Sequence, residues 1–366
     1  MHKRPLEILI FGAGAVGSTF GWRLAQNPFV RLSAVCRSNY TSIKTNGIHL
    51  RTTLWGNGSF RPHRVVKAVP DVQNVAFDYV VCANKLTPSD AVSFAEAIRP
   101  AVRPTTTLVS VQNGINVERP LKHMFEGNTI LSAICYASCQ QPLPGRVQQL
   151  TQIRPFAFAI GTYHSGSTDT KSENNKLEKL VSLDSKFKAI KDVNTERWTK
   201  MMFNGSLNPV SALTGLNSHQ LLQDSPSLTL AHRLAEEIYE VASRSGANLP
   251  ADSVSRTISC LQSPAPIVPS MLQDARDGRQ MEVEALCGNI WRQADAVGVS
   301  VPAVKATYDA LTSMNQKIGI PRQYAFASDP HTSVADLSTD LASETSRRAS
   351  EHLLCDVQPS ITPVAA

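Results

Sequence analysis

The side chains best suited to chemistry in this sequence lie on one face of a predicted helix. Lys200, Asn204 and Asn208 are spaced four residues apart within the run 196–209, so a helix places them in one line. The rest of this run is rich in large apolar side chains such as Trp198. Polar groups that are buried without partners cost free energy, so such a line on an apolar helix indicates a face that binds a ligand. The alternative is that the lysine marks a solvated edge of the helix.

Two further polar side chains follow predicted buried strands. Lys85 comes after the apolar run 77–83, and Asn113 comes after the run 107–111. In open parallel sheets, ligands collect beyond the carboxyl ends of the strands, so both side chains are placed to face a cofactor or a substrate. A single lysine or asparagine at a strand end is usually a turn residue, but two at successive strand ends favour a shared site.

The amino-terminal region carries a glycine-rich motif between a predicted strand and a predicted helix. The apolar run 6–11 stops in glycines, and helical character resumes at Ser18. Gly12 permits a tight turn, Gly14 lets the backbone approach a pyrophosphate, and Gly17 lets the helix pack on the strand. The motif that we expect to bind a dinucleotide comprises Gly12, Ala13, Gly14, Ala15, Val16 and Gly17. The alternative is a glycine-rich turn without function, against which the flanking strand and helix argue.

The end of the next predicted strand, 30–36, indicates which dinucleotide is bound. Folds that prefer NAD(H) tend to end this strand in an acidic residue that binds the ribose hydroxyls, whereas here Arg37 follows. A guanidinium group pairs with a 2′-phosphate, which a carboxylate would repel. The sequence therefore favours NADP(H), with a solvent-facing arginine as the alternative.

The composition is that of a soluble globular protein. The chain has 366 residues, of which 42% are hydrophobic and 18% charged, with a net charge of +6 and a pI near 8.9. Its basic residues are scattered, which argues against a nucleic-acid partner and is compatible with an anionic cofactor and substrate. No apolar run is long enough to span a bilayer, so we expect no membrane partner and a cytoplasmic location. The basic start 1–4 superficially resembles a signal peptide, but the glycines that follow explain the apolar run as a strand.

The cysteines suggest neither a disulfide framework nor a metal site. There are seven, an odd number, and they lie far apart with no CxxC pair. Cys135 and Cys139 are four residues apart, but no nearby histidine completes a ligand set. We expect buried or idle thiols and no bound metal.

The predicted elements change character near residue 193. Before it, strands alternate with other elements, and we expect hairpin or loop material over 40–70, a surface loop over 165–175 and a helix over 175–183. Helical periodicity then recurs over 229–247, 283–297 and 303–318. Ser270, after a proline-rich stretch, could cap a further helix.

Over roughly 6–320 the chain resembles the ketopantoate reductase family of NADPH-dependent 2-oxo acid reductases. The matching motifs are the glycine motif, Asn84-Lys85, Gln112-Asn113-Gly114, the run from Arg197 through Lys200 to Pro209, and the stretch from Ser270 through Asp274 and Arg279 to Glu282-Val283. The resemblance implies an α/β fold with an N-terminal Rossmann NADP-binding domain over 1–193 and an all-helical C-terminal domain over 194–321, with the active site in the cleft between them. We expect 322–366 to be a loosely ordered tail.

The resemblance also implies roles for individual residues. The family's general-acid lysine corresponds to Lys200, and its catalytic carboxylate, which also contacts the cofactor, corresponds to Glu282. The implied substrate contacts are Asn113, Asn204, Asn208 and Ser270. The implied cofactor contacts, besides the glycine motif and Arg37, are Lys85 and Asn113.

By this resemblance we expect hydride transfer from NADPH to a small 2-oxo acid, with ketopantoate as the first candidate. One position departs from the family pattern, which commonly has an asparagine three residues before the serine, where this chain has Ile267. This departure leaves open the reduction of another keto acid or ketone. A non-catalytic NADP(H)-binding sensor or scaffold is a third possibility, against which Lys200 and Glu282 argue. A monomer and a homodimer are both compatible with the sequence.

Overall fold

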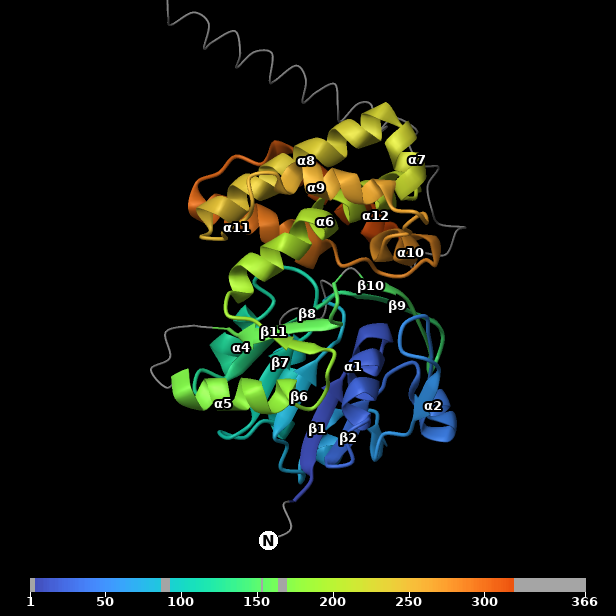
Figure 1. The fold of residues 1–366 in the computed structure, drawn as a ribbon, viewed down its shortest axis with the longest axis vertical. Helices are drawn as coiled ribbons and strands as arrows, with labels where there is room; N and C mark the ends of the chain where they lie inside the picture. Colours follow the sequence, from blue (N-terminus) through green and yellow to red (C-terminus); the bar gives the residue numbers. More distant parts are fainter. Residues whose placement is uncertain (1–3, 87–92, 153, 164–169, 319–366) are drawn as a thin grey trace, which may run out of the picture.

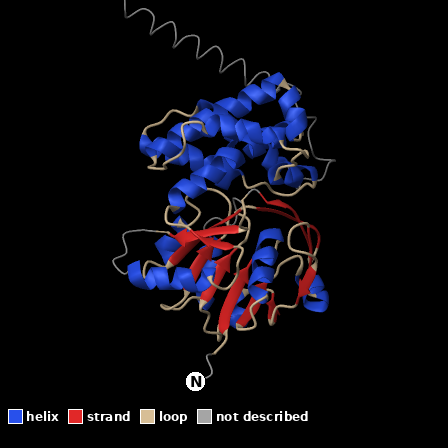
Figure 2. Ribbon diagram, in the orientation of Figure 1, coloured by secondary structure: helices blue, strands red, loops and turns tan. Residues whose placement is uncertain are grey.

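A computed structural model describes residues 4–86, 93–152, 154–163 and 170–318. Figure 1 shows a layered α/β part and a helical part, joined where α6 (Val193–Thr214) reaches down to the sheet. Figure 2 shows that the strands are confined to the first part. The predicted fold class, a Rossmann-like parallel sheet followed by helices, is confirmed. The expected tail over 322–366 lies outside the described residues.

The larger sheet has eight strands in the order β12-β11-β8-β7-β6-β1-β2-β5. They are β1 (Leu6–Phe11), β2 (Val30–Val35), β5 (Arg64–Val66), β6 (Tyr79–Cys82), β7 (Thr107–Ser110), β8 (Ile130–Cys135), β11 (Phe158–Thr162) and β12 (Phe187–Ala189). All neighbours are parallel except β8 and β11. The chain winds from β1 to β2 on one side and to β6 and β7 on the other. Sheets of this kind bind their ligands at such a switch point.

The central strands are buried on both faces. Ile8 and Ile10 of β1 pack on one face together with Phe20, while Leu9 packs on the other face together with Ile98. The first face is covered by α1 (Ala15–Ala25) and α5 (Thr170–Val181), and the second by α3 (Ser93–Ile98), η2 (Arg99–Ala101) and α4 (Arg119–Met124). Strands covered on both faces have near-continuous apolar sequences, which is why the sequence revealed them.

Helix α5 starts earlier than expected. It begins at Thr170, inside the stretch 165–175 that was predicted to be a loop, while 165–169 lie outside the described residues. The buried face of the helix consists of Glu173, Leu177 and Leu180. Because the first of these is a carboxylate, the first turn lacks the apolar signal of a buried helix.

The region 40–70 is more regular than expected. It contains α2 (Tyr40–Asn46), β3 (Ile48–Thr52), β4 (Gly58–Phe60), β5 and η1 (Val69–Val72). The expected hairpin is present as β3 and β4, but β3 also pairs in parallel with β10 (Arg146–Gln152), beside β9 (Ala137–Leu143). The prediction of loop material was wrong for the rest of this region, because its helix and its pairing with β2 and β10 depend on partners distant in sequence.

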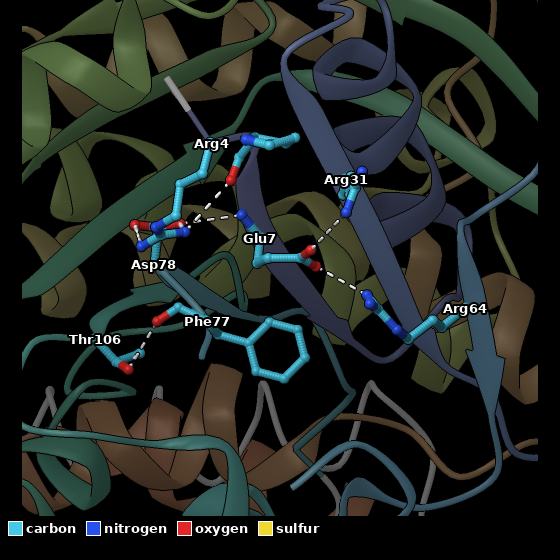
Figure 3. Close-up of polar contacts among 8 residues, drawn as sticks. Arg4, Glu7, Arg31, Arg64, Phe77, Asp78 and Thr106 are labelled. Carbon is cyan, nitrogen blue, oxygen red and sulfur yellow. Dashed lines mark hydrogen bonds and ion pairs between the residues drawn. The ribbon is translucent and has the colours of Figure 1, made fainter. Parts of the chain in front are cut away.

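A network of charged side chains connects the amino-terminal ends of the strands in the larger sheet (Figure 3). Arg4 donates two hydrogen bonds of 2.9 Å to Asp78, and Asp78 also accepts one of 3.0 Å from the backbone N–H of Glu7. The Glu7 carboxylate pairs with Arg64 at 2.8 Å and with Arg31 at 3.7 Å. These contacts join β1 to β2 and β5 at the ends of the strands opposite the glycine motif.

The helical part has one apolar core around α6. The elements packed about it are α7 (Ser218–Gln223), α8 (Ser225–Arg244), α9 (Ser253–Ser259), η3 (Cys260–Gln262), α10 (Ser270–Arg276), the π-helical turn η4 (Glu284–Gly288), α11 (Asn289–Val297) and α12 (Pro302–Lys317). Gly205 lets α6 approach its neighbours closely, because a Cβ there would lie 2.8 Å from the side chains of Ile238 and Ile290.

The helices predicted in this part correspond to α8, to η4 with α11, and to α12. Ser270 is the first residue of α10 and does not cap it, because Pro269 occupies the cap position. Among the residues that the structure describes, no helix combines the length and the apolar character needed to cross a membrane.

Glu237 of α8 holds the amino terminus of α12. Its carboxylate accepts hydrogen bonds from the backbone N–H groups of Ala303 at 2.9 Å and Val304 at 2.8 Å. Burial raises the pKa of Glu237 to about 7, although these two N–H groups act to lower it. The folded protein therefore binds a proton at Glu237 in a pH range where the unfolded chain releases it.

We expect Glu237→Gln to remove a pH-dependent contribution to stability. The pKa of Glu237 is about 7 in the folded protein and 4.5 for the ordinary group, so the unfolding free energy of the wild type falls as the pH rises between these values. Urea midpoints at about pH 5 and about pH 8 should show a larger loss for the wild type than for Glu237→Gln. Glu240→Gln, at an exposed position on α8, is the control and should follow the wild type. Equal losses in the wild type and Glu237→Gln would contradict this prediction.

Candidate active site

A cleft of about 910 Å³ opens where the strands of the larger sheet end, and residues of the helical part complete its wall. The predicted site residues that line it are Gly12, Ala13, Gly14, Ala15, Val16, Arg37, Lys85, Asn113, Ser270 and Glu282. The predicted site residues that do not line it are Gly17, Lys200, Asn204 and Asn208. The structure therefore brings together residues from both ends of the described chain.

The glycine turn after β1 has the conformation that its sequence requires. Gly12 has φ of +100°, and a Cβ there would lie 2.6 Å from the backbone nitrogen of Asn84. A Cβ on Gly17 would overlap the carbonyl oxygen of Gly12. Gly14, the residue before α1, has no atom within 4 Å of the position that a Cβ would take. Two glycines thus serve close packing, and the third leaves open space in front of the helix N-terminus.

Two cations line the cleft where β2 and β5 end. Arg37 follows β2 and Lys67 follows β5, and these strands are parallel neighbours with Val35 opposite Val66. The Lys67 ammonium group lies 5.1 Å from the ring centre of Tyr40. Lys67 was missed in the sequence because its strand was expected to be part of a loop. A lysine directly after the apolar pair 65–66 was the available signal.

A buried carboxylate joins the two parts of the chain across the cleft. The Nζ atom of Lys85, after β6, lies 2.5 Å from Oδ2 of Asp274 in α10. The other oxygen of Asp274 accepts a hydrogen bond of 3.0 Å from Arg279. The Asp274 side chain is 6% exposed, so both cations are needed to compensate its burial. Sequence reasoning assigned no role to Asp274, which appeared only within a family motif.

Glu282 is held at the same end of the cleft. Its Oε1 accepts a hydrogen bond of 3.1 Å from the backbone N–H of Leu86. Burial raises the pKa of Glu282, and the nearby Asp274 acts in the same direction. The charge of Lys85, the Leu86 N–H and a hydrogen bond from Asn113 act against this rise in pKa. The carboxyl group therefore holds its proton more readily than an exposed glutamate.

Lys200 meets the cleft through Asn113. The Nζ atom of Lys200 donates a hydrogen bond of 2.7 Å to Oδ1 of Asn113, which lines the cleft. Burial lowers the pKa of Lys200, and the charge of Arg197 lowers it further, while Cys135 and Glu282 act in the opposite direction. The ammonium group is therefore a stronger acid than that of an exposed lysine. It lies one side chain behind the cleft wall.

The remaining predicted residues are divided between the core and the rim. Asn204 and Asn208 are buried in α6, with 8% and 3% exposure, and Oδ1 of Asn208 has no hydrogen-bond partner among the described residues. Ser270 lines the cleft. Ile267 does not line it, and its backbone N–H and carbonyl groups bond to the side chain and backbone of Ser218 at 2.8 and 3.0 Å.

The cysteines near the site are free thiols. Cys135 is buried, whereas Cys139 lines the cleft and accepts a hydrogen bond of 3.4 Å from Thr19. Within the described parts of the chain, no group of three or more histidine, cysteine, aspartate or glutamate residues is placed to hold a metal ion.

Comparison with known proteins gives matches over both parts of the chain. Residues 8–163 match the family described as "Ketopantoate reductase PanE/ApbA", and residues 192–315 match "Ketopantoate reductase PanE/ApbA C terminal". The 2-dehydropantoate 2-reductase of Mesorhizobium japonicum is 27% identical over 343 residues, a match that covers 87% of this chain and 99% of that protein.

Solved structures share the same fold. The 2-dehydropantoate 2-reductase from Methylococcus capsulatus has a TM-score of 0.72 at 27% identity, covering 86% of this chain and 99% of that chain. D-mandelate dehydrogenase, solved with NADH and anilino(oxo)acetate, has a TM-score of 0.73 at 19% identity, covering 86% of this chain and 100% of that chain. Because the family matches span both parts of the chain, this protein belongs to the ketopantoate reductase family, a family of dinucleotide-binding oxidoreductases, as its motifs predicted.

Proposed function

We propose that this protein is an NADP(H)-dependent reductase of a small 2-oxo acid, with ketopantoate as the first candidate substrate. The observation that carries the proposal is the 2.7 Å hydrogen bond from Lys200 to Asn113. It sets an acidic ammonium group behind the wall of a cleft that also contains the glycine turn. A proton donor and a dinucleotide cradle at one cleft are what carbonyl reduction requires.

The residues present fit a dinucleotide. The close-packed turn at Gly12 and the open space at Gly14 leave room for a pyrophosphate at the N-terminus of α1, where backbone N–H groups favour an anion. Arg37 and Lys67 would hold a 2′-phosphate by charge-assisted hydrogen bonds. Lys85, Asn113 and Glu282 would hold the cofactor on the other side of the cleft. These contacts support NADP(H) over NAD(H).

When bound, the reduced nicotinamide supplies the hydride that converts a ketone carbon into an alcohol carbon. Lys200 stabilises the negative charge that develops on the ketone oxygen and donates the proton that completes the alcohol. Because burial lowers the pKa of Lys200, its proton is released more readily than that of an exposed lysine. The lowered pKa brings the acid closer to the pH at which proton transfer is most efficient.

The substrate is held by neutral and acidic groups. Ser270, on the cleft wall, orients it by a hydrogen bond that does not compete for the proton of Lys200. Asn204 and Asn208 lie behind that wall on the same face of α6 as Lys200, and we assign them substrate contacts only for a substrate that enters deeper than the cleft itself. Burial raises the pKa of Glu282, so this side chain can serve as a hydrogen-bond donor as well as an acceptor. We assign these contacts to the helical domain over 194–321, and the cofactor contacts chiefly to the domain over 1–193.

A second candidate is the reduction of a different 2-oxo acid. It is favoured by Ile267, which stands where the family pattern has a substrate-contacting asparagine. A hydrophobic side chain at this position removes one amide donor and acceptor from the substrate contacts. The first candidate therefore depends on Asn204, Asn208 and Ser270 to bind the hydroxyl group of ketopantoate.

We expect NADPH oxidation to depend on a 2-oxo acid. Absorbance of NADPH, followed with ketopantoate and with 2-oxo acids of different side chains, measures the substrate range. The highest kcat/KM with ketopantoate would support the first candidate, and the highest value with a more apolar 2-oxo acid would support the second. Binding of NADPH without turnover on any member of the panel would contradict the reductase proposal and support a non-catalytic binding protein.

We expect Lys200→Ala to lower kcat by about 100-fold or more without loss of NADPH binding, because only the proton donor is removed. Steady-state oxidation of NADPH measures kcat, and fluorescence titration measures the binding of NADPH. Lys191→Ala, at an exposed lysine just before α6, is the matched control and should retain wild-type kcat. Wild-type turnover in Lys200→Ala would exclude this lysine from the mechanism.

We expect Arg37→Ala and Lys67→Ala each to raise KM for NADPH by about tenfold, because each removes a charge-assisted contact with the 2′-phosphate. KM for NADH should change little, since NADH lacks that phosphate. Lys44→Ala, which removes the ammonium group bonded to the Tyr40 hydroxyl at 2.8 Å and does not alter the cleft wall, is the control. Equal effects on both cofactors would contradict the assignment of either residue.

A further inference from the structure

Arg197 has a buried side chain that bonds to five residues of the α/β part, the longest bond being 3.5 Å from Nη2 to the carbonyl oxygen of Ser110. Its Nε atom donates a hydrogen bond of 2.8 Å to Ser132, and its terminal nitrogen Nη1 donates to the carbonyl oxygens of Gln112 at 2.8 Å and Gly114 at 3.0 Å. The Nε atom also lies 2.6 Å from the Glu118 carboxylate. The side chains of this pair are 7% and 1% exposed. Arg197, a residue of α6, therefore binds the loop that follows β7.

Two of the carbonyl groups that Arg197 binds lie on either side of Asn113 in the sequence. On the helix, Arg197 and Lys200 are three residues apart and so lie on the same side of α6. The Arg197 guanidinium group thus fixes the backbone on both sides of Asn113. It also anchors α6 one helical turn before Lys200. The 2.7 Å hydrogen bond from Lys200 to Asn113 then joins the two residues whose backbones Arg197 holds.

The charge of Arg197 reaches Lys200 as well. The groups that act on Lys200 are Arg197 on its own helix, Cys135 at the end of β8, Cys139 on β9 and Glu282 before η4. Of these four side chains, Arg197 alone lowers the pKa of Lys200. Removal of the guanidinium charge therefore raises the pKa of Lys200.

A buried ion pair is a poor device for stability alone. Taking both charges out of water is expensive, and well-packed apolar side chains of similar volume often stabilise a fold equally well or better. A guanidinium group, however, is planar and offers five N–H donors in a fixed arrangement, which an apolar side chain cannot replace. The contacts of Arg197 use this arrangement on three backbone carbonyls and two side chains.

We propose that Arg197 is a positioning residue for the reaction, which holds Asn113 and Lys200 in register across the junction of the two parts of the chain. It does so through the carbonyl groups of Gln112 and Gly114. Its own side chain does not line the cleft, so we assign it no direct contact with the cofactor or the substrate. This inference rests on the proposed reductase function, because its main readout is turnover.

The test uses the full-length protein with two variants at the Arg197–Glu118 pair and one control variant elsewhere. Arg197→Lys keeps the charge and loses the planar group. Arg197→Met combined with Glu118→Gln removes both charges, so that no uncompensated carboxylate stays buried. Arg256→Met combined with Asp252→Asn removes the exposed ion pair of 2.7 Å in α9 and is the matched control. Circular dichroism and NADPH titration show that each variant is folded.

We expect Arg197→Lys and the Arg197→Met/Glu118→Gln variant each to lose about 100-fold in kcat, the effect of a misplaced reacting group, while affinity for NADPH falls much less because the glycine turn, Arg37 and Lys67 are unchanged. In the charge-free variant the alkaline limb of the kcat profile should also move to higher pH, because the pKa of Lys200 rises. Arg197→Lys should keep the limb near its wild-type position. The control pair should match the wild type in both.

Wild-type kcat in Arg197→Lys, or a charge-free variant that is folded and has wild-type kcat and an unmoved alkaline limb, would overturn the proposal. If the charge-free variant does not fold, Arg197→Lys decides the question. A wild-type protein that reduces no 2-oxo acid would instead overturn the proposed function. The two failures are therefore distinguishable.

Discussion

The buried guanidinium group of Arg197 is the constraint on which the arrangement of the site depends. A charge in a region of low dielectric constant must be neutralised and fully hydrogen-bonded, and Glu118, Ser132 and three backbone carbonyls meet this need. All of these partners belong to the α/β part, whereas Arg197 belongs to α6. The helical part is therefore fixed to the loop that follows β7, to β8 and to the start of α4, where Arg119 also bonds to Gln293 of α11 at 3.1 Å.

The same junction sets the shape of the cleft. Gly114 has φ of +108°. A Cβ on Gly114 would lie only 2.5 Å from the carbonyl oxygen of Ala285 in η4. A side chain at 114 would thus push η4 away from the loop, and with it Glu282, which precedes η4 in the chain. On the far side, the ion pair between Lys85 and Asp274 ties α10 to the end of β6. Like the Arg197–Glu118 pair, this contact joins the two parts of the chain through a buried charge.

Local signals in the sequence were enough for part of this arrangement. The glycine motif, Lys85 and Asn113 could be located because each directly follows an apolar strand, and a strand, its turn and the next helix are contiguous. Lys67 could not be located, because its position beside Arg37 depends on the pairing of β5 with β2. Arg197 and Asp274 were visible only as members of a family motif, since their partners lie 79 and 189 residues away in the chain. Residues whose role depends on a distant buried partner leave no periodic signal.

The acceptor that Lys200 uses is an amide and not a carboxylate, and this choice bears on its acidity. A buried ammonium group needs an acceptor, and a carboxylate at 2.7 Å would raise the pKa of Lys200 strongly. The neutral oxygen of Asn113 satisfies the hydrogen bond while leaving the effect of burial and of Arg197, both of which lower the pKa, in force. Glu282, the carboxylate whose charge acts on Lys200, is itself shifted toward its neutral form by burial. The surroundings of Lys200 therefore hold the amine in place and still keep its pKa below that of an exposed lysine.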